Sequence, residues 1–435
     1  MLPLLALPLL GLAAAHTGCG GHEIARRNPG GRVIHSRQVD NTNIDPVAEC
    51  TPYTYAPVSA IKSQFPAIWN SATLVPGDAD AAALFASINA TLNQRLPNTV
   101  PRGTHNGDWS GVNYPPADND CWWTWKQCTT PAASTGLVAD ITTMPEPETW
   151  GLGFDDGPNC SHNALYNFLQ DNSQKATMFF IGSNVLDWPV QAIRAKDDGH
   201  EICVHTWSHQ YMTSFSNEQA FAELYYTRKA IKDVIGVTPK CWRPPFGDVD
   251  NRIRLIASLL NMTTVVWSDD TDDWKVGIAN VTTQDVDNNY MKVINNAKAG
   301  AYATHGPVVL NHELNNYTMG ELIKMYPAIK AAFKYVVPIA TGLNITNPYQ
   351  ETDIVYPSFA QYTGVGNTSD AGSSSSVSGS ASGTASGSAS GSAASASHSA
   401  AASSASASKG SSASASTAIP AISLLGLAAA ATLFL

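Results

Sequence analysis

Acidic and histidine residues that suit hydrolytic chemistry recur in the middle of this 435-residue chain. Asp155 and Asp156 stand side by side in FDDGP, and His205 and His209 stand four residues apart in HTWSH. Residues four apart share one face of a helical turn, so the two imidazoles are expected to grip one metal ion. Two imidazoles and one carboxylate leave open coordination positions, as a catalytic zinc site requires. The pattern predicts that one aspartate binds a metal while the other stays free as a base.

Taken singly, these motifs have simpler interpretations, because Asp-Gly is common in turns and paired histidines are often unrelated. Hydrolysis also needs an acid for the leaving group. His312 suits this role if a carboxylate keeps it protonated, and the DDTDDW segment at 269–274 offers several. Arg243, on a Pro-stiffened loop, is suited to hold a carboxylate in a fixed orientation.

These residues follow short β-rich runs that alternate with helical patterns between 148 and 345. Such alternation predicts an α/β domain with parallel strands. The predicted strands cover 149–154, 176–182, 200–205, 240–245, 263–268, 306–312 and 334–340, and the clearest helices cover 216–236, 251–261 and 321–334. Seven strands favour closure into a barrel, where chemistry gathers on the loops after the strand ends. The polar clusters fall at those ends.

Both ends of the chain are typical of processing segments. Residues 1–15 predict a signal peptide, and the apolar tail at 418–435 follows small residues near Gly410, as in a GPI-anchor signal. A transmembrane helix is the alternative for the tail. Residues 370–417 are almost wholly Ser, Ala and Gly, which predicts a flexible stalk. We expect a secreted protein held by a GPI lipid at the outer leaflet of the plasma membrane and at cell-wall glycans.

Seven cysteines in a secreted chain predict disulfides, with one thiol left over. Cys121 and Cys128 are expected to close a loop, and Cys203 to be a buried thiol or half of a disulfide. The net charge of −10 argues against a nucleic-acid partner. Sequons for N-glycosylation occur at Asn89, Asn159, Asn261, Asn280, Asn316, Asn344 and Asn367.

Residues 16–147 form an N-terminal extension without recognisable chemistry, and 346–369 form a C-terminal connection. Within DCWWTWKQC, the residues Trp122, Trp123 and Trp125 either stack on sugars or pack on the barrel. Packing is favoured, because a buried Trp removes a large apolar area from water. His105 and His305 are interpreted as structural or surface residues. His162 is interpreted in the same way, with a place in the groove as the alternative.

Five motifs in order resemble those of polysaccharide deacetylases with a NodB homology domain, carbohydrate esterase family four, and most closely those of fungal chitin deacetylases. The motifs are FDDGP, HTWSH, RPPFG (243–247), DTDDW (270–274) and LNH (310–312). They lie in a predicted catalytic domain at 148–345, about half the chain. The resemblance implies a distorted, incomplete α/β barrel of about seven parallel strands with an open groove. Gly153 stands where the family usually has Thr, Val204 where many relatives have Asn, and Phe246 where Tyr is more frequent.

The resemblance implies a role for each motif at the catalytic centre. Asp155 would be the general base, oriented by Arg243. A divalent metal, Zn²⁺ or Co²⁺, would be bound by Asp156, His205 and His209.

The last three motifs would supply the acid and the pocket. Asp273 would support His312 as the general acid. A backbone N–H near Phe246 would stabilise the oxyanion together with the metal. Trp274 and Leu310 would wall the pocket around the acetyl methyl group.

The implied reaction is metal-dependent hydrolysis of the N-acetyl groups of N-acetylglucosamine residues in chitin, giving chitosan and acetate at the fungal cell wall. A water on the metal would attack, with Asp155 as base and His312 as acid. The alternatives are a deacetylase of another acetylated cell-wall glycan and a non-catalytic wall-binding protein. The complete set of motifs disfavours the second, and the lack of any G-x-S-x-G disfavours a serine esterase.

Overall fold

The computed structural model describes residues 33–34 and 40–365. Residues 1–371 form one compact unit, and a second unit, 372–435, lies wholly outside the described residues. The predicted signal peptide, stalk and anchor tail, with Gly410, Asn367 and Cys19, also lie outside them. Among the described residues, no helix combines the length and apolar character needed to cross a membrane.

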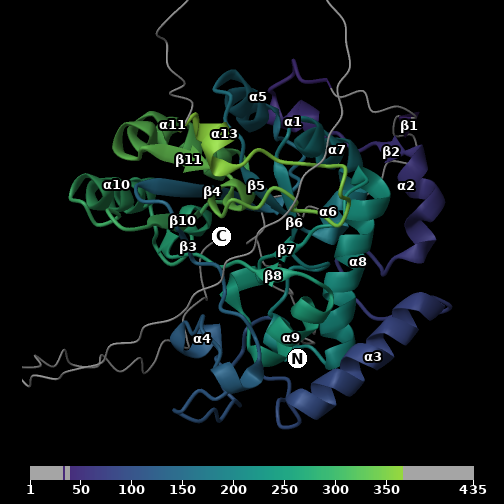
Figure 1. The fold of residues 1–435 in the computed structure, drawn as a ribbon. Helices are drawn as coiled ribbons and strands as arrows, with labels where there is room; N and C mark the ends of the chain where they lie inside the picture. Colours follow the sequence, from purple (N-terminus) through teal and green to yellow (C-terminus); the bar gives the residue numbers. More distant parts are fainter. Residues whose placement is uncertain (1–32, 35–39, 366–435) are drawn as a thin grey trace, which may run out of the picture. The chain divides into compact units, whose positions relative to one another are not determined.

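A curled sheet of nine strands lies at the centre of the described unit (Figure 1). Its main path runs β3-β10-β4-β5-β6-β7-β8, while β11 pairs with β4 and β9 with β10. In chain order the strands are β3 (Thr143–Met144), β4 (Thr149–Gly157), β5 (Thr177–Phe180), β6 (Glu201–Val204), β7 (Cys241–Trp242), β8 (Thr263–Thr264), β9 (Asp269–Asp270), β10 (Gly306–Leu310) and β11 (Tyr335–Val337). Neighbouring strands are parallel except β3, which is antiparallel to β10.

One isolated bridge, between Ile141 and Val265, links the two ends of this path. The sheet therefore curls into a distorted, incomplete α/β barrel, as predicted. Each of the seven predicted strands is present in a shorter form or, for β4, a longer one. The two-residue strands β3 and β9 were not predicted, because they are too short to show an alternating pattern. The predicted catalytic-domain boundary at 148 stays a prediction, although β3 lies before it.

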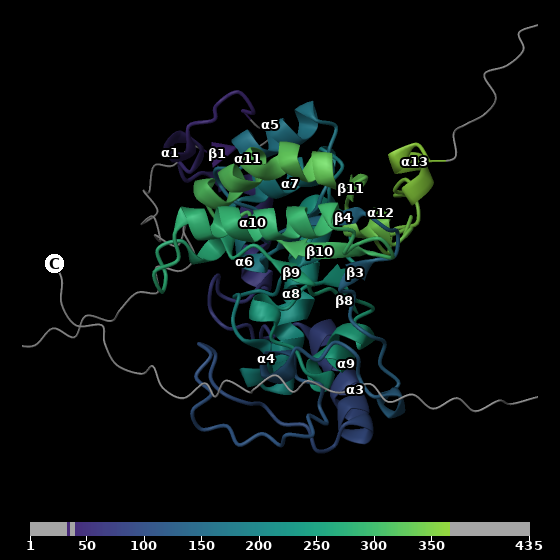
Figure 2. The ribbon, with the colours of Figure 1, turned by 90° about the vertical axis from the view of Figure 1, so that its left-hand side faces the viewer.

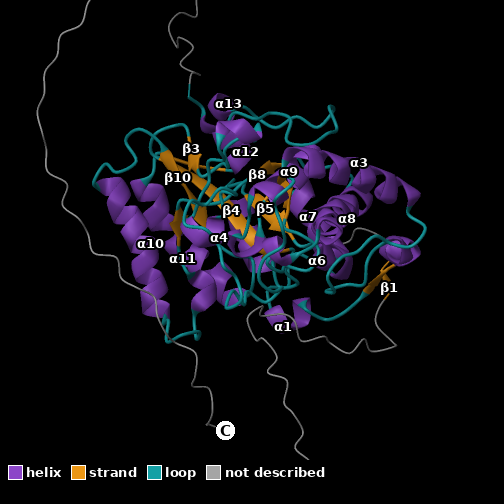
Figure 3. Ribbon diagram, turned by 90° about the horizontal axis from the view of Figure 1, so that it is seen from below, coloured by secondary structure: helices purple, strands orange, loops and turns teal. Residues whose placement is uncertain are grey.

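Helices cover the outside of the sheet, as Figure 3 shows with strands in orange and helices in purple. They are α5 (Asn163–Asp171), α6 (Gly182–Asp187), α7 (Pro189–Asp197), α8 (Asn217–Ile235), α9 (Asn251–Leu259), α10 (Thr283–Lys298), α11 (Asn316–Ala332), α12 (Ile339–Gly342) and α13 (Phe359–Thr363). The α8 prediction is confirmed by a capping box between Ser216 and Gln219 and by Gly236 in the left-handed region at φ 91°. The prediction for α11 began too late, because Asn315 caps the helix through the N–H groups of Tyr317 and Thr318.

The N-terminal extension packs on this barrel. It contains β1 (Val33–Ile34), α1 (Pro46–Glu49), β2 (Thr54–Tyr55), α2 (Ala56–Ile61), α3 (Ala79–Arg95) and α4 (Trp123–Lys126). The buried residues Ile88 and Leu92 of α3 belong to the same apolar core as the barrel helices. Figure 2 shows α3 and α4 beside α9. Barrel and extension therefore share one hydrophobic core.

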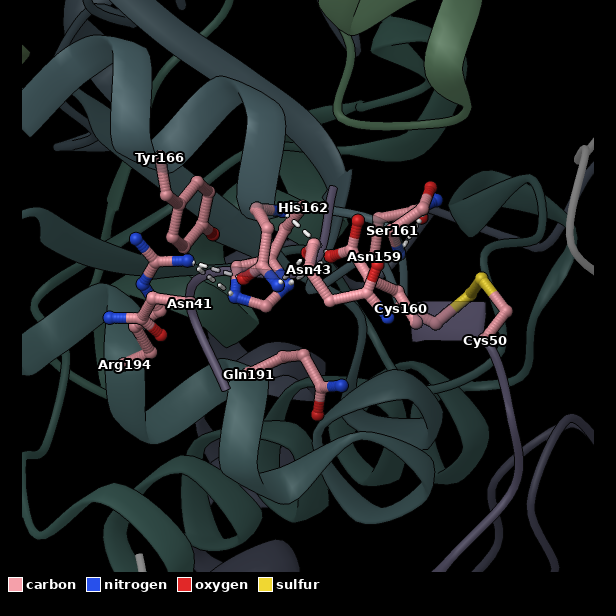
Figure 4. A network of polar contacts seen from close by, with 12 residues as sticks. Asn41, Asn43, Cys50, Asn159, Cys160, Ser161, His162, Tyr166, Gln191 and Arg194 are labelled. Carbon is pink, nitrogen blue, oxygen red and sulfur yellow. Dashed lines mark hydrogen bonds and ion pairs between the residues drawn. A yellow bond between two sulfur atoms is a disulfide. The ribbon is translucent and has the colours of Figure 1, made fainter. Parts of the chain in front are cut away.

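A polar network fixes the start of the extension to α5 (Figure 4). The disulfide between Cys50 and Cys160 joins α1 to the loop after β4. Beside it, the backbone N–H of Asn163 donates to Glu49 at 2.9 Å. His162 is fully buried, and burial together with the nearby Arg194 lowers its pKa to about 3. His162 is thus a neutral structural histidine and not a groove residue.

Two further disulfides match the expectations from the cysteine pattern. Cys121 and Cys128 close a loop, and Cys203 pairs with Cys241 across β6 and β7. Cys203 is therefore half of a disulfide. Glu201 lies close to these two sulfur atoms, but no thiolate remains there to bind a metal.

Candidate active site

The two aspartates of FDDGP lie at the end of β4, where its regular pairing with β5 breaks. The register shifts between Phe154 and Gly157, and Asp156 has a φ of 73°. Adjacent side chains of a regular strand point to opposite faces, but a bulge re-aims them. Both carboxylates consequently face the imidazole of His205, whose Nε2 lies 3.7 Å from Asp155 Oδ2 and 3.4 Å from Asp156 Oδ1.

His205 and His209 follow β6, but they do not lie in a helical turn. The segment is irregular, with Thr206 and His209 in the left-handed region at φ 64° and 54°. The prediction of a helical turn was therefore wrong, but the two imidazoles do lie close together, as predicted. The loop brings His209 Nε2 to 3.0 Å from Asp156 Oδ1, so Asp156 and both histidines converge.

These three residues fit a divalent cation. His205 Nδ1 lies 2.8 Å from the backbone oxygen of Arg243, which only accepts, so Nδ1 carries the proton and Nε2 presents its lone pair. That lone pair faces the buried Asp156 Oδ1, which has no hydrogen-bond partner of good geometry. Two ligand atoms of one tetrahedral zinc lie about 3.3 Å apart, given bonds of about 2.0–2.2 Å. The distances of 3.4 and 3.0 Å from Asp156 Oδ1 to the two imidazoles are close to that value.

Arg243 holds Asp155 from the end of β7. Its Nη1 donates to Asp155 Oδ1 at 2.7 Å, and both side chains are buried. The guanidinium carbon lies 4.0 Å from the ring centroid of Phe179 and 5.9 Å from that of Trp267. Cation–π contacts of this kind stabilise a desolvated guanidinium. Arg243 is therefore fixed, and Asp155 Oδ2 stays directed at the metal ligands.

Asp273 holds His312 from the other side of the cluster. Its carboxylate accepts from the backbone N–H of His312 at 2.9 Å and lies 2.6 Å from the ring Nδ1. Because a carboxylate only accepts, Nδ1 carries a proton and Nε2 is left for the site. Burial lowers the pKa of His312, but the charge and hydrogen bond of Asp273, with Asp156 and Asp155, outweigh it and raise the pKa to about 10. The imidazole is thus protonated at neutral pH.

Asp155 and His312, the predicted base and acid, lie on adjacent segments of the sheet. The N–H of Asp155 donates to the backbone oxygen of Asn311 at 3.0 Å, and the N–H of Glu313 donates to that of Asp155 at 2.8 Å. This bridge places Asp155 beside His312. Of the other aspartates in DDTDDW, Asp269 contacts Tyr302 and Asp272 contacts Lys275.

The remaining predicted site residues surround this centre. Phe246 lies 4.8 Å from the His209 ring and keeps 40% of its surface exposed. Trp274 is half-buried with its ring 6.5 Å from that of His312, and Leu310 is buried at the end of β10. The roles predicted for these residues stay predictions. Their positions around the cluster agree with those roles.

Gly153 now has a structural explanation. A Cβ at this position would lie 3.2 Å from the Phe179 ring and 3.3 Å from the backbone oxygen of Thr177. Glycine therefore lets the Phe179 ring, which contacts Arg243, pack close to β4. Val204 is buried at the end of β6, and its backbone oxygen accepts from the N–H of Arg243 at 2.9 Å.

The three tryptophans of the extension differ in exposure. Trp122 is 2% exposed, which agrees with packing on the barrel. Trp123 is half-buried with its ring 5.0 Å from Trp267, and Trp125 is 47% exposed. His105 and His305 are half-buried, and neither belongs to the cluster of Asp156, His205 and His209.

The sequence analysis missed four residues that support the site, three of them buried and one, Trp267, half-buried. Phe179 and Trp267 contact Arg243. Glu223 accepts hydrogen bonds from the HTWSH loop, and Asp248 accepts one from the backbone N–H of Thr213, shortly after that loop. Glu223 accepts from the N–H groups of Trp207 and Ser208 at 2.8 Å each. In the sequence these four read as ordinary strand, loop or helix residues, because their partners are distant along the chain.

One predicted glycosylation site conflicts with the fold. Asn159 is half-buried, and its Nδ2, the atom that would carry the sugar, donates to the backbone oxygen of Leu314 at 2.6 Å. The folded chain therefore does not present Asn159 for modification. Among the other described sequons, Asn89 is half-buried, while Asn261, Asn280, Asn316 and Asn344 are exposed.

Comparison with known proteins places this geometry in a family. The profile described as polysaccharide deacetylase matches residues 143–265. Chitin deacetylase 2 of Cryptococcus neoformans var. grubii is 62% identical over 381 residues, which cover 85% of this chain and 84% of the relative. The chain belongs to the polysaccharide deacetylase family.

Other relatives of this polysaccharide deacetylase carry similar names. Chitin deacetylase of Amylomyces rouxii is 45% identical over 71% of this chain and 74% of its own length. The solved structure of the Colletotrichum lindemuthianum chitin deacetylase is 23% identical, with a TM-score of 0.45, and covers 49% of this chain and 95% of that one. The profile match ends before Asp273 and His312, so for these two residues the assignment depends on the motifs and the geometry.

Proposed function

We propose that the chain hydrolyses the N-acetyl groups of N-acetylglucosamine residues in chitin and releases chitosan and acetate. The observation that carries the proposal is one arrangement: an Arg-held carboxylate and an Asp-held imidazolium flank a cluster of two histidines and one aspartate. The names of the relatives, which cover most of both chains, support chitin as the substrate.

The cluster of Asp156, His205 and His209 would hold the metal. A mixed His₂Asp set suits Zn²⁺, with Co²⁺ as the alternative. When bound, such a metal polarises a carbonyl oxygen and lowers the pKa of water.

Asp155 acts as the proton acceptor. Arg243 occupies its Oδ1, so Oδ2 is the oxygen that faces the cluster. A base in a fixed orientation within hydrogen-bond reach of water is what general-base catalysis needs. The buried guanidinium also keeps the carboxylate paired when water is excluded by substrate.

His312 acts as the proton donor. Amide cleavage needs a proton on the leaving nitrogen, since an amide anion leaves poorly. The raised pKa keeps His312 protonated, and the bond from Nδ1 to Asp273 leaves Nε2 to donate. We place the acetyl methyl group between Trp274 and Leu310 and the oxyanion near the N–H of Phe246.

We also propose a cell-surface location, which depends on segments outside the described residues. The apolar ends and the Ser/Ala/Gly-rich stretch at 370–417 motivate it. Release of the protein from intact cells by a phosphatidylinositol-specific phospholipase C would support the lipid anchor. Retention of the protein on treated cells, with a cleavable anchored control protein released, would contradict it.

The substrate is tested by measuring acetate release from N-acetylated chitin oligomers and from O-acetylated glycans. We expect release from chitin oligomers, its loss with a chelator, and its return with Zn²⁺ or Co²⁺. Acetate release from O-acetylated glycans but not from chitin oligomers would show that chitin is not the substrate. No release from either substrate by the metal-loaded protein would support a non-catalytic wall-binding role.

A further inference from the structure

The RPPFG loop has a strained backbone beside the metal ligands. Phe246 and Gly247 are successive left-handed residues, with φ of 57° and 71°. A left-handed non-glycine residue is strained and persists only where its surroundings fix it. The predicted oxyanion donor is a backbone N–H near Phe246, so whatever fixes this loop also fixes that donor.

Asp248 follows the loop directly, and hydrogen bonds from other segments hold its side chain in place. It is fully buried, and its carboxylate accepts four hydrogen bonds. Two come from Thr213, from N at 2.7 Å and from Oγ1 at 2.8 Å. The others come from Trp122 Nε1 at 2.8 Å and from Thr124 Oγ1 at 2.5 Å. None of the four donors belongs to the RPPFG loop.

Two of these donors belong to the loop closed by the Cys121–Cys128 disulfide, which we call the 121–128 loop. The N–H of Trp123 donates to the backbone oxygen of Val249 at 2.9 Å. A Cβ on Gly247 would lie 2.6 Å from the Trp123 ring, so this ring packs directly on Gly247. The 121–128 loop therefore contacts the strained turn through both side chains and backbone.

The 121–128 loop is itself held to the barrel. Arg254 of α9 donates to the backbone oxygens of Cys121 and Cys128 at 2.6 and 2.7 Å. The same guanidinium is paired with the buried Asp140 at 2.8 and 2.7 Å. A loop anchored at both ends can transmit a defined position to the residues that it contacts.

Thr213 connects Asp248 to the second motif. It lies in a short 3₁₀ turn, Met212–Ser214, that follows the metal ligand His209. One carboxylate thus joins the 121–128 loop, the segment after His209 and the RPPFG loop.

We propose that Asp248 is a positioning residue, and that the N-terminal extension sets the orientation of the Phe246 N–H relative to the metal ligands through Trp122 and Thr124. This inference rests on the proposed deacetylase function, because it assigns a catalytic purpose to the extension. Misplacement of a reacting group by about 1 Å can lower a rate by about 100-fold. The extension would in this way position a group of the catalytic site from a distance.

Thr124 offers the cleanest test. Thr124→Val removes the hydroxyl that donates to Asp248 while the shape is kept, and Thr124→Ser keeps the hydroxyl. We expect Thr124→Val to lower kcat on chitin oligomers about 10-fold with KM within a factor of about two, since only the transition state uses the oxyanion donor. Thr124→Ser is expected to restore most of the rate. Thr363→Val, which removes a hydroxyl that donates to Phe359 in α13, is the remote control.

Hydrogen exchange gives a second readout that does not depend on substrate. Amides of residues 244–249 are expected to exchange faster in Thr124→Val than in Thr124→Ser, with the metal bound at one ion per chain in both. Unchanged kcat and unchanged exchange in Thr124→Val would overturn the positioning role while leaving the deacetylase function intact. An inactive wild-type protein would contradict the proposed function and the catalytic purpose, whatever the exchange shows. An equal loss of rate in Thr363→Val would indicate a general loss of stability and also overturn the proposal.

Discussion

Asp155 and Asp156 are neighbours in the chain, yet their carboxylates have different partners. Asp155 is held by Arg243, while Asp156 faces the imidazoles of His205 and His209. The bulge at the end of β4 and the left-handed φ of Asp156 make this division possible. Two adjacent like charges are tolerated here because each has its own cationic or metal-binding partner.

The division of roles predicts different losses for the two aspartates. Asp155→Asn removes the base but no metal ligand, so we expect kcat to fall about 100- to 10,000-fold while zinc still binds. Asp156→Asn is expected to weaken zinc binding as well. Acetate release and zinc stoichiometry by isothermal titration measure the two effects. Near-normal activity in Asp155→Asn, or lost zinc binding in that variant, would contradict the assignment.

Asp273 predicts a shift in the pH profile. The acid must be protonated, so activity is lost as pH rises through the pKa of His312, which Asp273 raises. Asp273→Asn removes that charge and leaves burial, which lowers the pKa, so the alkaline limb of kcat should move to lower pH. Asp269→Asn, in the same segment but bonded to Tyr302, is the control and should keep the wild-type limb. An unmoved limb in Asp273→Asn would remove His312 as the titrating acid.

At the scale of elements, short strands present the site and distant segments hold it. The ends of β4, β6, β7 and β10 carry Asp156, His205, Arg243 and His312. Motif loops with several left-handed residues are strained. The buried carboxylate of Glu223 accepts from an N–H group of the HTWSH loop, and that of Asp248 accepts from the N–H of Thr213 in the turn that follows. The extension contributes to this support through the 121–128 loop and through the Cys50–Cys160 disulfide beside FDDGP.

The two disulfides of the extension should stabilise the folded chain to different extents. Cys50 and Cys160 are 110 residues apart, while Cys121 and Cys128 are 7 apart. Closing the longer loop removes more entropy from the unfolded chain, so the Cys50→Ser/Cys160→Ser variant should lose about 5 kcal/mol and the Cys121→Ser/Cys128→Ser variant about 2.5 kcal/mol. Denaturant titrations under non-reducing conditions give both values. A larger loss for the short loop would contradict this ranking.

At the scale of the whole molecule, the metal site joins parts that are far apart in the chain. Asp156 comes from β4, while both histidines come from the loop after β6. The unfolded chain cannot hold these ligands together, so metal binding should favour the folded state. Because barrel and extension share one hydrophobic core, metal binding should stabilise both of them against unfolding.

Zinc should therefore raise the melting temperature. Free zinc at about 100 times its Kd stabilises the folded state by about 2.7 kcal/mol, and a chelator should reverse the effect. His209→Ala, which removes one ligand, should show a much smaller shift. Differential scanning calorimetry of the full chain measures both, and equal shifts in wild type and His209→Ala would place zinc at another site.

The sequence by itself determined the alternation of strands and helices and the α8 boundaries, and its motifs pointed to residues that the fold brings together. Those features are local: alternation, capping residues and short motifs can be read over a few positions. It misjudged the helical turn at His205–His209 and the start of α11. Tertiary structure alone decided why Gly153 is small and what holds the RPPFG loop, and it showed the contact between Asp273 and His312 that the resemblance had implied. The partners in these contacts are 24 to 126 residues apart, and only the folded chain brings them together.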